Sequence, residues 1–295
     1  MEISELRRLH FITKASSTLN SMVEDPNLVL PVLPEIADQV RKVMGNELND
    51  FDAVAELVET EQGMSARILQ VANSPIYAGL ERIKSIQQAI GRLGIRETRN
   101  ILMAVVVQHL FSTNVRQLRE MMKRLWLHSI ATAYSNEMIC QELGVKDSED
   151  FFMMGLLHDI GKLLIIHLLQ VGIEKGEWRE SDITEDTVNQ IMTIRHNDLG
   201  ARLLEKWQYP GSFREVVRLH DDTTNIHFRS EAVLVTYFSN LLTRKVNFSL
   251  LPYEGDPLSD RTLANALNMP PKRREEFERT IKEITSKIQR SCFAE

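Results

Sequence analysis

The sequence predicts an all-α protein. Apolar residues recur at the three- and four-residue spacing of helices along most of the 295 residues, which is the primary sequence signal for helix. Residues that cap or break helices, among them Pro34, Ser85 and Gly94, separate these stretches. No segment shows a convincing alternation of apolar and polar residues, the pattern of a half-buried strand, and no internal repeat is present.

The first half of the chain contains the patterns of six helices. Ser85 and Gly94 are suited to cap helix 86–93 at its two ends, and Asp52 is suited to cap another. Residues 101–107 include three consecutive valines, yet the helices on both sides favour helix over strand. The predicted helices cover residues 2–20, 34–45, a segment starting at Asp52, 65–72 with a break at Asn73-Ser74-Pro75, 86–93 and 101–107.

The second half predicts six more helices. The polar stretches 171–186 and 247–260 are expected to be loops between them. In the last helix the apolar residues share one face and charged residues cover the rest, so we expect it on the surface. The predicted helices cover residues 115–143, 150–160, 186–206, 212–220, 229–244 and 271–290.

Composition and charge limit the partners of this chain. A content of 43% hydrophobic and 26% charged residues is typical of a globular protein. The net charge of −6 argues against nucleic acid or a membrane as a partner, because both favour basic surfaces. Two distant cysteines, Cys140 and Cys292, argue against a disulfide framework and favour a reducing cytoplasm. The first residues lack the apolar core of a signal peptide.

One apolar segment, residues 151–173, is long enough to suggest a membrane span. His158, Asp159 and Lys162 fall in its middle, and charges near the centre of a bilayer are costly. We therefore expect a buried segment of a globular core, broken at Gly161.

The stretch 155–162, Gly-Leu-Leu-His-Asp-Ile-Gly-Lys, is the most informative part of the sequence. It places two residues with metal-ligand chemistry, His158 and Asp159, inside an apolar run. Burying a carboxylate costs several kcal/mol unless it is paired. A metal ion is the strongest partner, and a network of buried hydrogen bonds is the alternative.

Three further histidines lie in predicted helices: His128, His196 and His220. A single histidine is more often structural than a ligand, so only their combination is informative. Imidazole and carboxylate ligands suit iron, manganese or zinc. Such a metal lowers the pKa of a bound water and can support phosphoester hydrolysis. Lys162 could contact a phosphate, or it could be a solvated lysine near a helix end.

With these residues the chain resembles a known family. His128, the His158-Asp159 pair and residues 160–162 resemble the HD superfamily of metal-dependent phosphohydrolases. More specifically, the chain resembles the HDOD domain, an HD-related output domain of bacterial signalling proteins. The segments that carry this resemblance are 30–34 (Leu-Pro-Val-Leu-Pro), 68–75 (Ile-Leu-Gln-Val-Ala-Asn-Ser-Pro), 86–94 (Ile-Gln-Gln-Ala-Ile-Gly-Arg-Leu-Gly), 196–201 (His-Asn-Asp-Leu-Gly-Ala) and 217–220 (Val-Arg-Leu-His).

The resemblance implies a multi-helix HDOD fold with an HD-like helical core and the following division of the chain. An N-terminal helix occupies residues 1–25. The HDOD domain follows at 26–225, with an N-terminal helical lobe at 26–112 and the HD-like core at 113–225. Residues 226–295 would form C-terminal helices that complete and cover this core.

The resemblance also implies a ligand set. His128, His158, Asp159, His196 and His220 match metal ligands of the HD-GYP relatives, which hydrolyse cyclic di-GMP. Asn240 stands where active HD enzymes carry a late aspartate, and it would be a weaker, neutral ligand. This set implies a divalent iron, manganese or zinc ion, with Asp159 and Lys162 as the candidate catalytic residues. The alternative is that these residues form only a buried hydrogen-bond network.

Several departures weaken the case for catalysis. Residues 231–244 contain no aspartate at all, and His220 is followed by Asp221-Asp222. The chain contains no Gly-Tyr-Pro loop, and Glu61-Gln62 stands where the family usually has Asp-Pro. HDOD proteins are commonly regarded as non-catalytic.

The sequence therefore supports three functional hypotheses. The first is a bacterial signal-transduction output module that acts by contacts with a signalling protein partner, without turnover. The alternative is a metal-dependent phosphohydrolase acting on a nucleotide or cyclic dinucleotide. The third is a pseudoenzyme that binds a nucleotide without cleaving it.

Overall fold

The computed structural model describes residues 3–31, 39–40, 51–60, 64–73, 77, 81–145, 149–222, 224, 229–246, 248–250, 272–273, 275–276, 278–283 and 286. Most of the predicted helix 34–45, the Ser74-Pro75 break, most of the predicted loop 247–260, much of the predicted last helix, and Cys292 lie outside these residues. Within the described ranges all regular structure is helical, with no strand, which confirms the all-α prediction.

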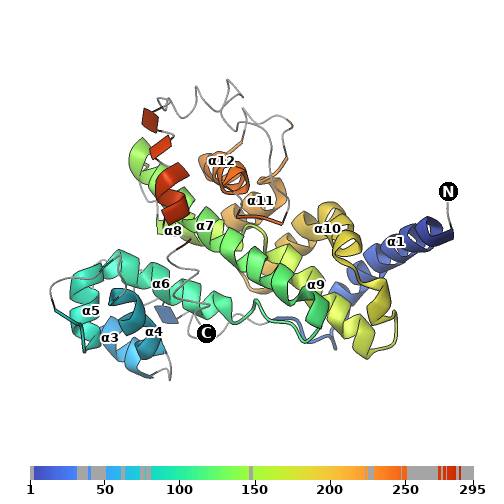
Figure 1. Ribbon diagram of the computed structural model, residues 1–295, viewed down its shortest axis with the longest axis horizontal. Coiled ribbons are helices and arrows are strands. Elements are labelled where there is room, and N and C mark those ends of the chain that lie inside the picture. The colour runs from blue at the N-terminus through green and yellow to red at the C-terminus, as the bar shows by residue number, and fades with distance from the viewer. Residues whose placement is uncertain are drawn as a thin grey trace. The chain divides into compact units, whose positions relative to one another are not determined.

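The chain divides into two compact units, 1–32 with 111–282 and 33–110 with 283–295. The described helices of the first unit are shown in Figure 1. Two short 3₁₀ turns, η1 (Arg116–Leu118) and η2 (Glu180–Asp182), connect some of them. The α-helices of this unit are α1 (Ile3–Glu24), α7 (Arg119–Leu143), α8 (Glu149–Leu157), α9 (Ile160–Glu174), α10 (Glu185–Lys206), α11 (Gly211–Leu219) and α12 (Glu231–Lys245).

The second unit contains α3 (Phe51–Thr60), α4 (Met64–Ala72), α5 (Ile86–Leu93) and α6 (Ile95–Gln108). The predicted caps of α5 are confirmed: the Ser85 side chain accepts a hydrogen bond from the Gln88 amide, and Gly94 ends the helix with φ +80°. Residues 101–107 lie in a helix as predicted. Asp52 lies inside α3 and does not cap it, because the helix already includes Phe51.

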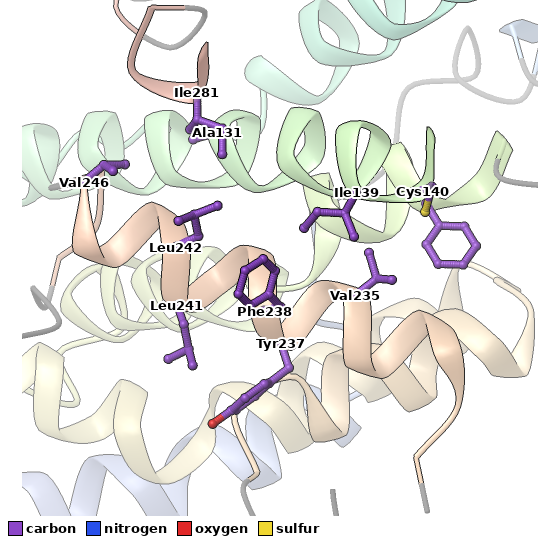
Figure 2. Packing of buried hydrophobic residues seen from close by; sticks show 11 residues of the cluster. Ala131, Ile139, Cys140, Val235, Tyr237, Phe238, Leu241, Leu242, Val246 and Ile281 are labelled. Atoms are coloured by element: carbon purple, nitrogen blue, oxygen red, sulfur yellow. The ribbon is translucent and has the colours of Figure 1, made fainter. Parts of the chain in front are cut away.

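One apolar cluster of the first unit lies between α7 and α12. Val235, Phe238 and Leu242 recur at helical spacing on α12 and are almost fully buried. Figure 2 shows them facing α7, where Ile139 lies opposite. Burial of such side chains contributes about 1.5–3 kcal/mol each, so this interface holds α12 firmly against α7.

The apolar segment 150–174 is packed inside the first unit. It is the one stretch of the described residues that is long and apolar enough to cross a membrane, and 83% of its apolar window is buried. Helical structure is interrupted at His158 and Asp159, which form a turn between α8 and α9. The predicted break at Gly161 was therefore wrong: Gly161 lies inside α9. Helix α9 also continues to Glu174, so the loop predicted from 171 begins later.

Gly161 allows α9 and α10 to approach closely. A Cβ atom at this position would lie 1.9 Å from the main-chain oxygen of His196 and 2.8 Å from the amide nitrogen of Gly200. Gly200 faces it across the interface, where a Cβ would meet Val217 and Gly161 itself. The two helix backbones are therefore in direct contact at the level of His196.

Helix α1 runs parallel to α10. Arg8 pairs with Asp186 near the start of the two helices, and Arg202 Nη1 lies 2.9 Å from Glu24 Oε1 near their ends. In both pairs the two partners are 178 residues apart in sequence, so α1 and α10 keep the same axial register between the two ion pairs. The buried face of α1 consists of Phe11, Ile12, Ala15, Ser16, Leu19, Met22 and Val23.

Candidate metal centre

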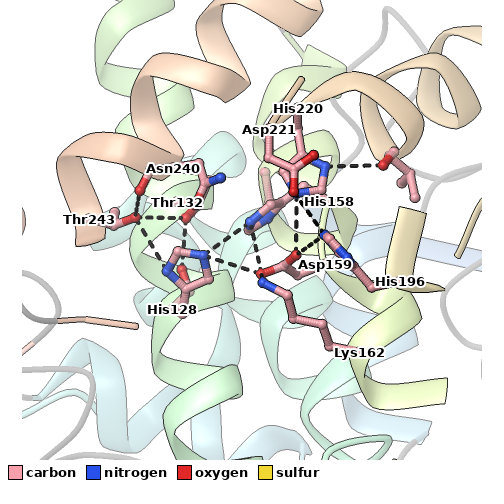
Figure 3. A network of polar contacts seen from close by, with 12 residues as sticks. His128, Thr132, His158, Asp159, Lys162, His196, His220, Asp221, Asn240 and Thr243 are labelled. Atoms are coloured by element: carbon pink, nitrogen blue, oxygen red, sulfur yellow. Dashed lines mark hydrogen bonds and ion pairs between the residues drawn. The ribbon is translucent and has the colours of Figure 1, made fainter. Parts of the chain in front are cut away.

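Four histidines and one aspartate, from three helices and one interhelical turn, converge on one buried point of the first unit (Figure 3). His128 lies within α7, and His158 and Asp159 form the turn between α8 and α9. His196 lies in α10, and His220 is the C-terminal cap of α11. All five residues are at most 4% exposed. The fold therefore brings together the five principal ligands expected from the sequence.

The main chain fixes the tautomer of each histidine. Every Nδ1 lies within hydrogen-bond distance of a carbonyl oxygen, which can only accept, so Nδ1 carries the proton. Each Nε2 is left with a free lone pair directed toward Asp159. Metal-binding histidines are typically oriented in this way. The carbonyl partners are those of Phe248 for His128 (2.6 Å), Gly155 for His158 (2.7 Å), Met192 for His196 (2.7 Å) and Val217 for His220 (3.1 Å).

One half of the centre, which we call the Lys162 half, consists of His128, His158 and the Oδ2 atom of Asp159. Oδ2 lies 3.4 Å from His128 Nε2 and 3.3 Å from His158 Nε2. The two Nε2 atoms lie 3.1 Å apart, although neither carries a proton in the tautomers set by the carbonyls. A cation is already present here, because Lys162 Nζ lies 2.6 Å from the same Oδ2.

The other half, which we call the Asp221 half, consists of His196, His220 and the Oδ1 atom of Asp159. Oδ1 lies 3.6 Å from His196 Nε2 and 3.3 Å from His220 Nε2. Among the described residues, none forms a hydrogen bond with any of these three ligand atoms. The Asp221 carboxylate lies at the edge of this half, with Oδ2 3.3 Å from His196 Nε2.

Burial sets the charge state of the centre. It lowers the pKa of His128, His158 and His196, that of His158 to about 4, so these imidazoles are neutral at pH 7. Burial opposes ionisation of Asp159 as well, but the Lys162 ammonium beside it holds the pKa of this carboxyl group well below the ordinary range. These three histidines thus present neutral nitrogen ligands to a carboxylate anion.

These residues fit a divalent metal ion. Each half offers three ligand atoms within 4.8 Å of one another. Lone pairs that face each other without a proton repel, and buried polar atoms without partners cost free energy; a metal ion removes both penalties. A hydrogen-bond network alone leaves the ligand atoms of the Asp221 half unsatisfied. The imidazole and carboxylate donors suit iron, manganese or zinc.

Asn240 lies near the His128 side of the centre (Figure 3). It is 3% exposed, and its Oδ1 atom has no hydrogen-bond partner in the part of the chain that the structure describes. Nearby, the Thr243 hydroxyl lies 3.3 Å from His128 Nδ1 and donates a hydrogen bond to the Asn240 carbonyl. Asn240 therefore adds a neutral amide beside the Lys162 half.

The sequence reasoning did not include Asp221 among the ligands. The only signal was its position directly after His220, where α11 ends, and whether its side chain turned toward the centre depended on the fold. The Asn197 side chain donates a hydrogen bond of 2.7 Å to Asp221 Oδ1, which leaves Oδ2 toward His196. Lys162 contacts Asp159 and is 21% exposed; its expected contact with a phosphate stays a prediction.

Comparison with known proteins identifies the family of this chain. The sequence model of the HDOD domain matches residues 30–223. The chain belongs to the HDOD domain family. An uncharacterized protein of Treponema pallidum (strain Nichols) is 21% identical over 258 residues, which cover 84% of the HDOD chain described here and 47% of that protein. The chain thus spans about half the length of this relative.

Solved structures share the HDOD fold. An HDOD domain protein of unknown function from Geobacter sulfurreducens has a TM-score of 0.70 at 19% identity, over 95% of this chain and 97% of that chain. A candidate metal-dependent phosphohydrolase from Shewanella amazonensis SB2B has a TM-score of 0.67 at 19% identity, over 92% and 99% of the two chains. At such identities the likeness establishes the fold alone.

Proposed function

We propose that this HDOD protein is a cytoplasmic signal-transduction module that binds one divalent metal ion in the Asp221 half and acts by contact with a protein partner, without turnover. The observation that carries this proposal is the asymmetry of the centre. In the Lys162 half an ammonium group already neutralises Asp159 Oδ2. In the Asp221 half three buried ligand atoms have no hydrogen-bond partner among the described residues.

The residues that would hold the metal are His196, His220 and Asp159, with Asp221 at the edge. A metal bound there supplies a Lewis acid that can polarise a phosphate oxygen and lower the pKa of a bound water. The chain's own residues favour binding over turnover. The five converging ligands are at most 4% exposed. By the resemblance to HD enzymes, Asn240 supplies a neutral amide where the active members carry an aspartate.

Metal analysis and activity assays together test this proposal. Protein purified without chelators is expected to contain about one iron, manganese or zinc ion per chain and to leave cyclic dinucleotides and nucleotide phosphodiesters intact. The variant His220→Ala should lose the metal, whereas His10→Ala, at an exposed position on α1, should keep it. Absence of metal from the unaltered protein would contradict the metal centre.

The second candidate function is a metal-dependent phosphohydrolase. The convergence of four imidazole lone pairs on a carboxylate supports it. Hydrolysis that disappears in His220→Ala and persists in His10→Ala would establish this activity and overturn the non-catalytic part of the proposal. Binding of a nucleotide without cleavage, measured by calorimetry, would instead support a nucleotide-sensing pseudoenzyme.

Replacing Lys162 by methionine is expected to raise the metal content from one ion to two per chain. Methionine has a similar length and no charge, so it frees Asp159 Oδ2 for a second ion beside His128 and His158. Metal titration followed by elemental analysis measures the change. Lys206→Met, at an exposed position near the end of α10, is the matched control. An unchanged stoichiometry in Lys162→Met would show that the lysine does not exclude the second ion.

A further inference from the structure

The second unit contains a pocket of about 570 Å³ on one face of α4. Ala66, Leu69, Gln70 and Asn73 line it from α4, at positions that share one side of a helix. The opposite face of α4, with Ile68 at its centre, is buried in the core of the unit. The volume lies within the range of about 300–1,000 Å³ that is common for small-molecule sites.

The other wall of the pocket is the short segment 82–84. Arg82 and Lys84 are exposed, whereas Ile83 between them is buried, which is the alternation of an extended segment. Arg82 and Lys84 therefore lie on the same side of the chain, and both line the pocket.

Hydrogen bonds hold this wall in place. The Asn73 side chain donates to the carbonyls of Leu69 and Ile83, both at 2.9 Å, and accepts from the Ile83 amide at 2.8 Å. Arg92 donates to the carbonyl of Glu81 at 2.7 Å. The asparagine of the Ala-Asn-Ser-Pro motif thus joins the wall to α4, which preorganises the pocket.

The pocket is positively charged in an acidic protein. Among the described residues that line it, none has an acidic side chain. Neither Arg82 nor Lys84 has an ion-pair partner within the described ranges. Residues 33–110 contain eight basic and ten acidic side chains, so the positive charge at the pocket is a local feature. Two neighbouring cations without counter-ions attract a dianion.

We propose that this pocket binds a phosphomonoester with a flat or apolar body, the chemistry of a nucleoside monophosphate. The forked donors of Arg82 match phosphate oxygens, and the Lys84 ammonium adds a second charge. Leu69, Ala66 and the edge of Ile83 supply apolar surface for the body, and the Gln70 amide can donate or accept at the rim. The site shares no residue with the candidate metal centre, so neither proposal depends on the other.

Calorimetry on the full chain tests this inference with AMP as the probe and with adenosine and inorganic phosphate for comparison. We expect AMP to bind at one site and both partial ligands to bind at least tenfold more weakly. Arg82→Gln combined with Lys84→Gln should weaken AMP binding at least tenfold. Arg116→Gln combined with Arg119→Gln, which removes two exposed cations from the other unit, should leave it unchanged.

A second variant tests the volume of the pocket independently of its charge. Ala66→Trp places a large side chain in the pocket at an exposed helical position, so it should block AMP without changing the charge or the fold. AMP affinity that survives either Ala66→Trp or the Arg82/Lys84 double variant overturns the proposal, as does the absence of AMP binding. Inorganic phosphate that binds as tightly as AMP overturns the role of the apolar surface.

Discussion

Replacing Gly161 by alanine is expected to destabilise the first unit strongly. The added methyl group would meet the main chain of α10, 1.9 Å from the His196 oxygen and 2.7 Å from its carbonyl carbon. Main-chain atoms cannot turn away as a flexible side chain can, so α9 and α10 must separate. Overpacking of a core costs about 1–3 kcal/mol, and we expect a loss at the upper end, about 3 kcal/mol.

Chemical denaturation followed by circular dichroism measures this loss. Gly91→Ala is the matched control, because a Cβ at Gly91 in α5 meets nothing within 4 Å. There, alanine is expected to stabilise the helix by up to about 1 kcal/mol. Equal effects of the two substitutions would show that the contact between α9 and α10 adjusts without cost.

Replacing Asp159 by asparagine is expected to abolish metal binding. Asp159 is the one anion that both halves of the centre share, through Oδ2 in the Lys162 half and Oδ1 in the Asp221 half. Even groups that only orient a ligand change metal affinity by about 10- to 100-fold, so loss of the shared carboxylate should exceed about 100-fold.

Titration of metal into chelator-treated protein measures this affinity, with circular dichroism to verify that the variant is folded. Asp198→Asn is a suitable control, because Asp198 lies on α10 close to His196 in sequence, but its side chain is 44% exposed and pairs with Arg202. A folded Asp159→Asn protein that binds metal as tightly as the unaltered chain would show that the carboxylate is not a ligand.

Local signals in the sequence predicted most of the helices. Ser85 and Gly94 cap α5 because their conformational preferences act over a single turn. The role of Gly161 was misjudged, because glycine is both a helix breaker and the residue that permits close helix packing. Only the position of α10 in space decides between the two, and no local pattern contains that information.

In the candidate site, too, some residues could be predicted from the sequence, whereas others depended on the fold. His128, His158, Asp159, His196 and His220 could be named from sequence because their spacing resembles a family pattern. Asp221 could not be named from sequence, because its approach to His196 depends on how α11 ends beside α10. The contact between Lys162 and Asp159 was also unpredictable, since a lysine one turn into a helix can equally extend into solvent.

The alignment of α1 with α10 has a mechanical consequence. The ion pairs at the two ends of this helix pair have the same sequence separation, so a slip of one helix along the other would break both at once. It would also unseat the apolar side chains of α1, including Ala15 and Leu19, which are fully buried. A force applied to α1 along its axis would therefore displace α10 as a rigid helix. Because α10 carries His196, a force on the N-terminal helix would displace a residue of the candidate metal centre.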